Sequence, residues 1–161
     1  MTALVLHPLA ARAQEVATPK QIISISPLSL VFGLLGAEYE HRLSTSSAWG
    51  ASGSVYRSDE FTYVATEAKW RYYPQEKALE GFAVGLTGGV THVATRDAIV
   101  GKASSALSLG FALDYQWLLG PKKKFAVTLG TGARRLIGLS DSLSGASLTL
   151  PTFRLSIGRG F

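Results

Sequence analysis

Apolar and polar side chains alternate along most of this chain, and the alternation is clearest in residues 148–161. There, Phe153, Leu155 and Ile157 recur at every second position, while Arg154 belongs to the intervening polar face. A period of two places successive side chains on opposite faces of a β-strand. The final segment is therefore predicted to be a strand with one apolar and one polar face.

The same alternation predicts eight strands, separated by segments rich in Gly, Ser or charged residues. They are expected at residues 22–30, 35–43, 49–56, 61–73, 81–95, 104–119, 125–137 and 148–161. Ordinary strands average roughly 5–6 residues, whereas a tilted strand needs about 9–11 to cross a bilayer. The long strands favour a barrel wall over a sandwich. Short connections, which argue against large adhesive loops, are expected at 31–34, 57–60, 96–103 and 138–147.

The sequence does not indicate a membrane-spanning helix, because no apolar run approaches the roughly 18 residues that such a helix needs. The longest run, residues 28–37, is interrupted by Ser29 and two glycines. A chain that crosses by strands must close into a barrel, because an open sheet would leave unpaired backbone groups in lipid. We therefore predict an all-β fold, an eight-stranded antiparallel up-and-down transmembrane β-barrel.

Aromatic residues gather beside alternate turns. In an even-stranded barrel with both termini on one side, the turns after the second, fourth and sixth strands share that side. The aromatic residues that flank these turns or end the chain are Trp49, Tyr72, Tyr73, Phe82, Trp117, Phe125 and Phe161. Amphipathic rings prefer the membrane interface, so these residues are predicted to form a girdle there. Tyr56, Phe61 and Tyr63 are expected to form a thinner belt at the opposite end.

Charged residues fall mainly on the polar faces, which would point into the barrel. The predicted lumen charge network consists of Glu38, Glu40, Arg42, Glu67, Lys69, Arg71, Asp114, Arg134 and Arg154. The interior of an eight-stranded barrel is just wide enough to be filled by side chains. Opposite charges that pair there offset part of their desolvation. We expect a structural plug of salt bridges; the alternative is a proton or ion path, or an acid/base site.

Composition and charge limit the possible partners. The chain has 161 residues, enough for one domain, and its 17 glycines suit bends and close packing in a β-protein. The absence of cysteine excludes a disulfide scaffold and a thiolate metal site. The net charge is +5, but the basic residues are scattered among apolar strands, apart from the lysines at 122–124. No nucleic-acid partner is expected from this pattern.

The N-terminus resembles the remnant of an export signal. Residues 3–9 form a short apolar run, and the following Ala11-Arg12-Ala13 has the small-x-small pattern of a signal-peptidase site. We expect cleavage after Ala13, with a disordered tail as the alternative. The predicted organisation is a signal-peptide remnant at 1–13, an N-terminal arm at 14–21 and a β-barrel domain at 22–161.

The signal-like start, amphipathic strands, short alternate turns and terminal Phe161 together resemble the small eight-stranded outer-membrane barrels of Gram-negative bacteria. Residues 37–43 (AEYEHRL) also resemble the second strand of a little-studied group of these proteins, with a Tyr-Glu-Arg-like pattern. The resemblance implies a location in the bacterial outer membrane and contact with its lipid and lipopolysaccharide. It also implies that the barrel-assembly machinery recognises the C-terminal strand, although Arg159 departs from the usual terminal signal.

Catalytic and metal-binding patterns are weak. Lipid A deacylase barrels, which are similar in size, use a serine activated by a histidine, but neither His41 nor His92 belongs to a His-x-Ser motif. Two histidines without clustered carboxylates do not suggest zinc. The Gly-rich segments at 85–89 and 130–132 lack the Lys-Ser/Thr pair of a phosphate loop.

We therefore expect no catalytic, cofactor or metal site, and a structural or interaction role in the cell envelope. One alternative is a lipid A-modifying hydrolase of the outer membrane. The other is a soluble, lipocalin-like ligand-binding barrel, in which apolar side chains would point inward and charges outward.

Overall fold

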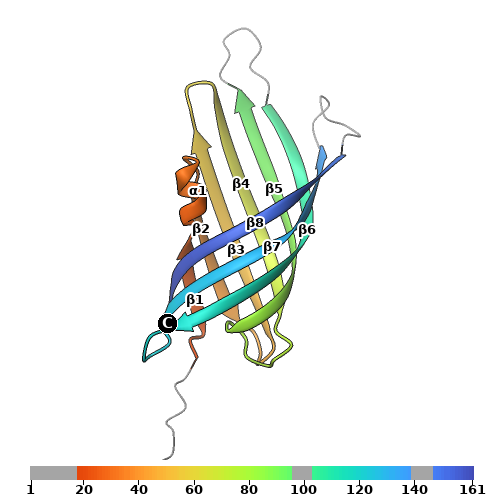
Figure 1. The fold of residues 1–161 in the computed structure, drawn as a ribbon. Coiled ribbons are helices and arrows are strands. Elements are labelled where there is room, and N and C mark those ends of the chain that lie inside the picture. The colour runs from red at the N-terminus through yellow and green to blue at the C-terminus, as the bar shows by residue number, and fades with distance from the viewer. Residues whose placement is uncertain (1–17, 96–102, 139–146) are drawn as a thin grey trace, which may run out of the picture.

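The chain forms one closed cylindrical sheet, as seen in a computed structural model that describes residues 18–95, 103–138 and 147–161 (Figure 1). Each strand pairs antiparallel with its neighbours in sequence, and the first strand closes the barrel against the last. The strands are β1 (Gln21–Ile25), β2 (Leu35–Arg42), β3 (Ser47–Arg57), β4 (Phe61–Tyr72), β5 (Gly81–Thr95), β6 (Ala103–Leu119), β7 (Phe125–Gly138) and β8 (Ser147–Gly160). The predicted eight-stranded antiparallel up-and-down barrel is confirmed. Within these residues, no helix is long and apolar enough to cross a bilayer.

The strand predicted at residues 22–30 is wrong in its second half. β1 is only five residues long and is followed by a short helix, α1 (Pro27–Val31). Ser26 caps this helix, because its Oγ accepts a hydrogen bond from the Ser29 N–H (3.4 Å). Pro27 follows in the first turn, where its missing N–H leaves no hydrogen bond unmade. Local capping therefore ends the strand earlier than the apolar pattern predicts.

Alternation along the strands sorts apolar and charged side chains to opposite sides of the wall. Leu86 and Leu129 point outward and are 61% and 54% exposed, whereas Arg71 and Asp114 point into the lumen and are 1% and 2% exposed. A soluble barrel buries its apolar face, because removing apolar surface from water drives folding. The observed sidedness is the reverse, so the inward apolar face expected for the lipocalin-like alternative is wrong.

The first and last described residues lie at the same end of the barrel, here called the turn end (Figure 1). The Phe161 carbonyl oxygen, just beyond β8, accepts hydrogen bonds from the N–H groups of Lys20 (2.8 Å) and Gln21 (3.3 Å). The opposite end, called the loop end, carries the α1 connection. Several predictions lie wholly or largely outside the described residues: the export signal at 1–13, the arm at 14–21, and the loops at 96–103 and 138–147.

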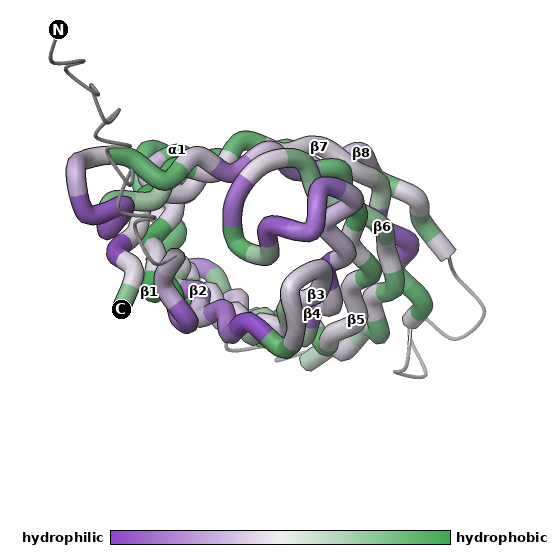
Figure 2. The backbone as a smooth tube through the Cα atoms, turned by 90° about the horizontal axis from the view of Figure 1, so that it is seen from below, coloured by the Kyte–Doolittle hydropathy of each residue, from purple (hydrophilic) through white to green (hydrophobic). Residues whose placement is uncertain are grey.

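The turn between β4 and β5, residues 73–80, folds inward and fills the turn end of the lumen. Gln116 of β6 donates a hydrogen bond to the Leu79 carbonyl oxygen (2.7 Å), and Lys123 pairs with Glu80 (2.7 Å). Seen from this end, part of the backbone curls across the opening (Figure 2). The buried apolar residues that surround this inward turn or belong to it are Ile22, Ala48, Tyr73, Ala78, Leu79, Ala83, Leu118 and Ala126.

At the loop end, aromatic side chains point into the barrel, so the predicted outer belt of Tyr56, Phe61 and Tyr63 is wrong. Phe61 and Tyr63 alternate in phase with the buried charges of β4, and Tyr63 lines the lumen cavity. The rings of Tyr56 and Phe61 lie 5.2 Å apart. A Cβ at Gly33 would lie 3.2 Å from the Tyr56 ring. Gly33 follows α1 with a φ of +73°, and the predicted loop at 31–34 begins inside that helix.

Candidate functional site

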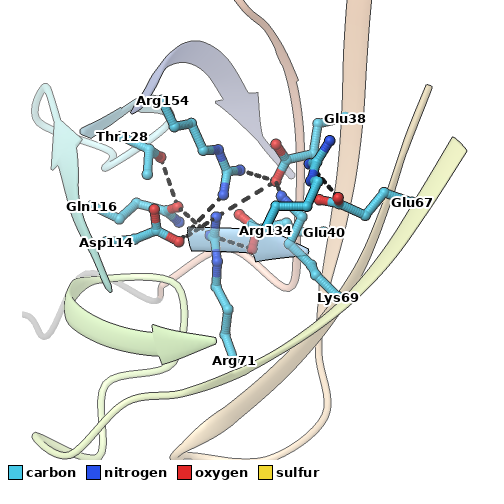
Figure 3. A network of polar contacts seen from close by, with 10 residues as sticks. All are labelled: Glu38, Glu40, Glu67, Lys69, Arg71, Asp114, Gln116, Thr128, Arg134 and Arg154. Atoms are coloured by element: carbon cyan, nitrogen blue, oxygen red, sulfur yellow. Dashed lines mark hydrogen bonds and ion pairs between the residues drawn. The ribbon is translucent and has the colours of Figure 1, made fainter. Parts of the chain in front are cut away.

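Charged side chains from four strands meet inside the barrel (Figure 3). They come from β2, β4, β6 and β8, and we call them the central cluster. Its members are Glu38, Glu40, Lys69, Arg71, Asp114 and Arg154. Three are acidic and three are basic, so the cluster is formally neutral, which is what allows so many charges to be withdrawn from water.

Arg71 has ionic contacts with all three acidic residues of the central cluster. It pairs with Glu40, with Asp114 Oδ2 (3.0 Å) and more loosely with Glu38 (3.7 Å). Arg71 also donates a hydrogen bond to Gln116 Oε1 (3.2 Å), which accepts a second one from Thr128 Oγ1 (2.8 Å). Because Gln116 is also bonded to the inward turn, the charges and the closure of the turn end form one connected structure.

Glu38 connects opposite sides of the barrel seam. It pairs with Lys69 of β4 and with Arg154 of β8, and Arg154 also pairs with Asp114 (3.3 Å). β2 and β8 are far apart in sequence, but both are neighbours of β1 in the closed sheet. Ring closure therefore brings the acidic second strand and the basic eighth strand together.

Two of the remaining predicted network residues form a separate pair, and one does not join the network. Arg134 pairs with Glu67 nearer the loop end, with side chains that are 29% and 13% exposed. Arg42, in contrast, donates a hydrogen bond to Oγ1 of Thr18 (2.7 Å), the first described residue. The prediction that Arg42 belongs to the lumen network is wrong. Arg42 is the last residue of β2 and lies at the turn end, below the central cluster.

Glycines on the inner face create room for the charged side chains. A Cβ at Gly130 would lie 1.8 Å from Asp114 Oδ1. A Cβ at Gly50 would lie 3.1 Å from Glu40 Cγ and 3.2 Å from Lys69 Cγ. Strand glycines often mark such close approach. The central cluster therefore depends on small neighbours as well as on its own charges.

Above the central cluster, toward the loop end, the lumen holds a cavity of about 280 Å³. Charged residues line its floor, including Arg71 and Asp114, and small polar residues such as Ser54 and Thr152 line its wall. The predicted structural plug thus occupies only part of the lumen. No pattern in the sequence indicates this cavity, because its volume depends on how side chains of different strands share the interior.

On the outside, most of the predicted girdle residues lie close to the turn end. They are Trp49, Tyr72, Phe82, Trp117, Phe125 and Phe161. Sequence reasoning missed two rings that extend this set: Tyr39 contacts Trp49 edge-on (5.7 Å between centroids), and Tyr115 contacts Trp117 (4.6 Å). Pairing of β2 with β3 brings Tyr39 beside Trp49, which only the register shows, whereas Tyr115 and Trp117 lie two residues apart on the same face of β6.

Tyr73 does not belong to the girdle, and its assignment there was wrong. β4 ends at Tyr72, and the next residue turns inward, where its N–H donates to the Ser46 carbonyl oxygen (2.8 Å). The Tyr73 side chain is fully buried. Burial raises the pKa of its hydroxyl, and the negative charge of Glu40 adds to the rise.

The barrel wall brings together a histidine and a serine that are not adjacent in sequence. His92 of β5 lies opposite Ser105 of β6, and His92 Nδ1 is 3.0 Å from Ser105 Oγ. His92 is exposed on the outer face. A search for His-x-Ser could not find this pair, because strand register creates it. Among the described residues, no three histidine, aspartate or glutamate side chains form a group suited to a metal ion.

Comparison with known proteins finds a similar fold and no similar sequence. The N-terminal β-barrel domain of Pseudomonas aeruginosa OprF matches 90% of this chain and 100% of its own length, with a TM-score of 0.53 and 13% sequence identity. No family model matches the sequence, and no characterised protein does. At this identity, the likeness to the OprF domain supports the barrel architecture without transferring an activity.

Proposed function

We propose that this protein is a β-barrel of the bacterial outer membrane with a structural or interaction role in the cell envelope. The observation that carries the proposal is the sidedness of the wall. Leu86, Leu109 and Phe111 face outward, half or more exposed, while Arg71 is buried behind them. Burying apolar surface yields roughly 25 cal/mol per Å² in water, a gain that this arrangement forgoes unless lipid surrounds it.

Two further features support the membrane location. The sheet closes through the pairing of β1 with β8, which gives most strands a partner on both edges, as the absence of water in lipid requires. Aromatic rings collect on the outside near the turn end, as they do at the interfaces of transmembrane barrels. The likeness to the N-terminal β-barrel domain of OprF agrees with the barrel architecture on which this proposal rests. Lipid, lipopolysaccharide and the barrel-assembly machinery, which would read the strand ending in Phe161, are the partners that follow from it.

Fractionation and gel mobility test the location. When it is exported in a Gram-negative host, the protein should sediment with outer membranes, and unheated samples should migrate faster in a detergent gel than boiled ones. A soluble monomer in detergent-free buffer would contradict the proposal. For the role, a structural protein should leave the mass of lipid A unchanged and should not conduct in planar bilayers.

The pair formed by His92 and Ser105 favours one second candidate, a lipid-modifying hydrolase. A histidine nitrogen 3.0 Å from a serine hydroxyl can accept its proton, which is how serine nucleophiles are activated. Because the pair lies on the outer face, its substrate would be an ester of a surrounding lipid. Mass spectrometry of envelope lipids tests this candidate: lipid cleavage by the protein that is lost in Ser105→Ala would favour the hydrolase, and unchanged lipids would exclude it.

A further inference from the structure

The barrel wall is paired on one side only near the loop end, because β1 is too short to cover β8. β8 pairs with β7 over residues 147–159, but with β1 only over residues 157–160. Residues 147–156 therefore have no strand partner on their second edge in the described chain. Helix α1 lies beside part of this edge, where Ser26 Oγ donates to the Leu155 carbonyl oxygen (3.1 Å). We call α1 and the unpaired edge of β8 the lateral opening.

The sequence is suited to such an opening. Pro27 begins α1, and Pro151 lies within the one-sided part of β8. Proline cannot donate a ladder hydrogen bond, so strands tolerate it at their edges. The exposed side chains around the opening are apolar, and Phe153 is 76% exposed; the others are Leu28, Leu30, Val31 and Phe32. In a membrane, this rim would lie against lipid chains.

The lumen cavity reaches the lateral opening. Ser26, Ser29 and Phe153 line the cavity on that side, and Arg134 and Arg154 line it more deeply. A polar chamber is thus continuous with an apolar rim. This arrangement matches an amphiphile whose head group lies in the lumen and whose chain leaves through the wall.

The charged residues that line the cavity have a net charge of +1, from Lys69, Arg71, Arg134 and Arg154 against Glu38, Glu67 and Asp114. In the pair of Arg134 with Glu67, the arginine side chain is the more exposed, at 29% against 13%; Arg154 is 20% exposed against 10% for Glu38. The donors of cavity-lining residues that are buried without a hydrogen-bond partner among the described residues include Arg71 Nε, Arg134 Nε and Ser156 Oγ, against one acceptor, Asp114 Oδ1. Free donors beside guanidinium groups favour an anionic acceptor such as a carboxylate or phosphate.

We propose that the cavity binds the anionic head group of a single-chain amphiphile, for example a fatty acid, whose chain passes through the lateral opening beside α1. A cavity of about 280 Å³ accommodates a head group and the first part of a chain, not a whole lipid. This inference rests on the proposed membrane location, and it adds a ligand class to a barrel that is otherwise structural.

Binding to the purified barrel in neutral detergent tests the inference. Oleate, lysophosphatidate and monoolein, which differ in head group, compete with a fluorescent fatty acid for the protein. An anionic ligand should bind at a ratio of one to one and at least about tenfold more tightly than monoolein. Preference for oleate or for lysophosphatidate identifies the head group as carboxylate or phosphate. Equal affinity for monoolein would overturn the inference.

Two variants place the ligand in the cavity. Gly36 lines the cavity, and a Cβ there would have its nearest neighbour, Ser54 Cβ, at 3.8 Å, so Gly36→Leu should fold yet fill the space and abolish binding. The double variant E67Q/R134Q removes a charge pair from the cavity and should weaken oleate binding about tenfold without changing that of monoolein. The matched control E80Q/K123Q removes a similar pair at the turn end and should bind as the parent does.

Failure of the inference and failure of the membrane proposal give different results. If the Gly36→Leu barrel keeps its heat-dependent gel mobility and binds oleate as tightly as the parent does, the cavity is not the site. Fractionation as a soluble protein would instead overturn the membrane location, whatever the binding result.

Discussion

Replacing Arg71 with methionine should be among the most destabilising single changes in this barrel. Methionine keeps most of the aliphatic length of the side chain and removes its charge. The central cluster holds three cations and three anions, so the variant leaves two cations against three anions and a net charge of −1 in the lumen. The perturbation is therefore electrostatic and confined to the interior.

The structure supports a large effect. Removing one partner of a buried ion pair costs about 3–5 kcal/mol. Arg71 is 1% exposed, and among the described residues it is the one ionic partner of Glu40, which is itself 2% exposed. Asp114 keeps Arg154 as a partner. Because Glu40 loses its ionic partner while Asp114 keeps one, we expect a loss of about 3–4 kcal/mol in the free energy of unfolding.

Urea unfolding of the barrel in lipid vesicles, followed by tryptophan fluorescence and by gel mobility, measures this loss. The double variant E40Q/R71M removes both charges of the pair formed by Arg71 and Glu40 and restores neutrality. It should therefore be more stable than Arg71→Met alone, with a total cost of about 1–2 kcal/mol. The two changes together thus cost less than one of them.

Lys123→Met is the matched control, because Lys123 pairs with Glu80 at the turn end, where the two side chains are 33% and 23% exposed. A pair this accessible contributes about 0–1 kcal/mol. A surface pair contributes at most about 1 kcal/mol. If the free energies of unfolding of Arg71→Met and Lys123→Met differ by less than this amount, buried charge pairing does not stabilise the lumen. A double variant that is no more stable than Arg71→Met would refute the reasoning as well.

Three further predictions concern the interior. Tyr73 should ionise late in an absorbance titration, because burial raises its pKa. The stability that the neutral hydroxyl contributes is present below the unfolded pKa of about 10 and is lost as the pH rises above that value. Tyr73→Phe should remove this loss of stability at alkaline pH. Gly132→Ala should lower the free energy of unfolding in urea by about 3 kcal/mol, because its Cβ would lie 2.1 Å from the Phe111 carbonyl oxygen. Gly36→Ala, the control, should change it by less than about 0.5 kcal/mol. Equal effects of the two variants would contradict the steric argument. Leu79→Ala should cost about 2–5 kcal/mol and raise the conductance of planar bilayers, and unchanged conductance would show that the inward turn is not the seal.

Strand positions and their sidedness could be predicted from sequence because a period of two is a local property. The predicted strand at 81–95 agrees with β5 at both ends. The helix α1 was missed because residues 27–31 are too few to show a helical period, and their helical conformation depends on the cap supplied by Ser26. In short segments, capping residues therefore carry as much information as the hydrophobic pattern.

Other features could not be predicted because they arise from contacts between strands. The pair of His92 with Ser105 exists only in the observed register of β5 and β6. Tyr73 is different, because it keeps the phase of Lys69 and Arg71, so the alternation alone places it on the inner face. Of the predicted lumen charges, Arg42 was misplaced for a related reason: the alternation gives the side of the wall and not the height along it.

The turn end of the barrel is closed by a turn of the barrel itself, which affects how small molecules can pass through the lumen. Residues 73–80 are covalently continuous with β4 and β5, and Gln116 and Lys123 hold them from other strands. They can leave the interior only if these contacts break. The interior is therefore closed at the turn end, and a molecule in it must leave through the loop end or the lateral opening.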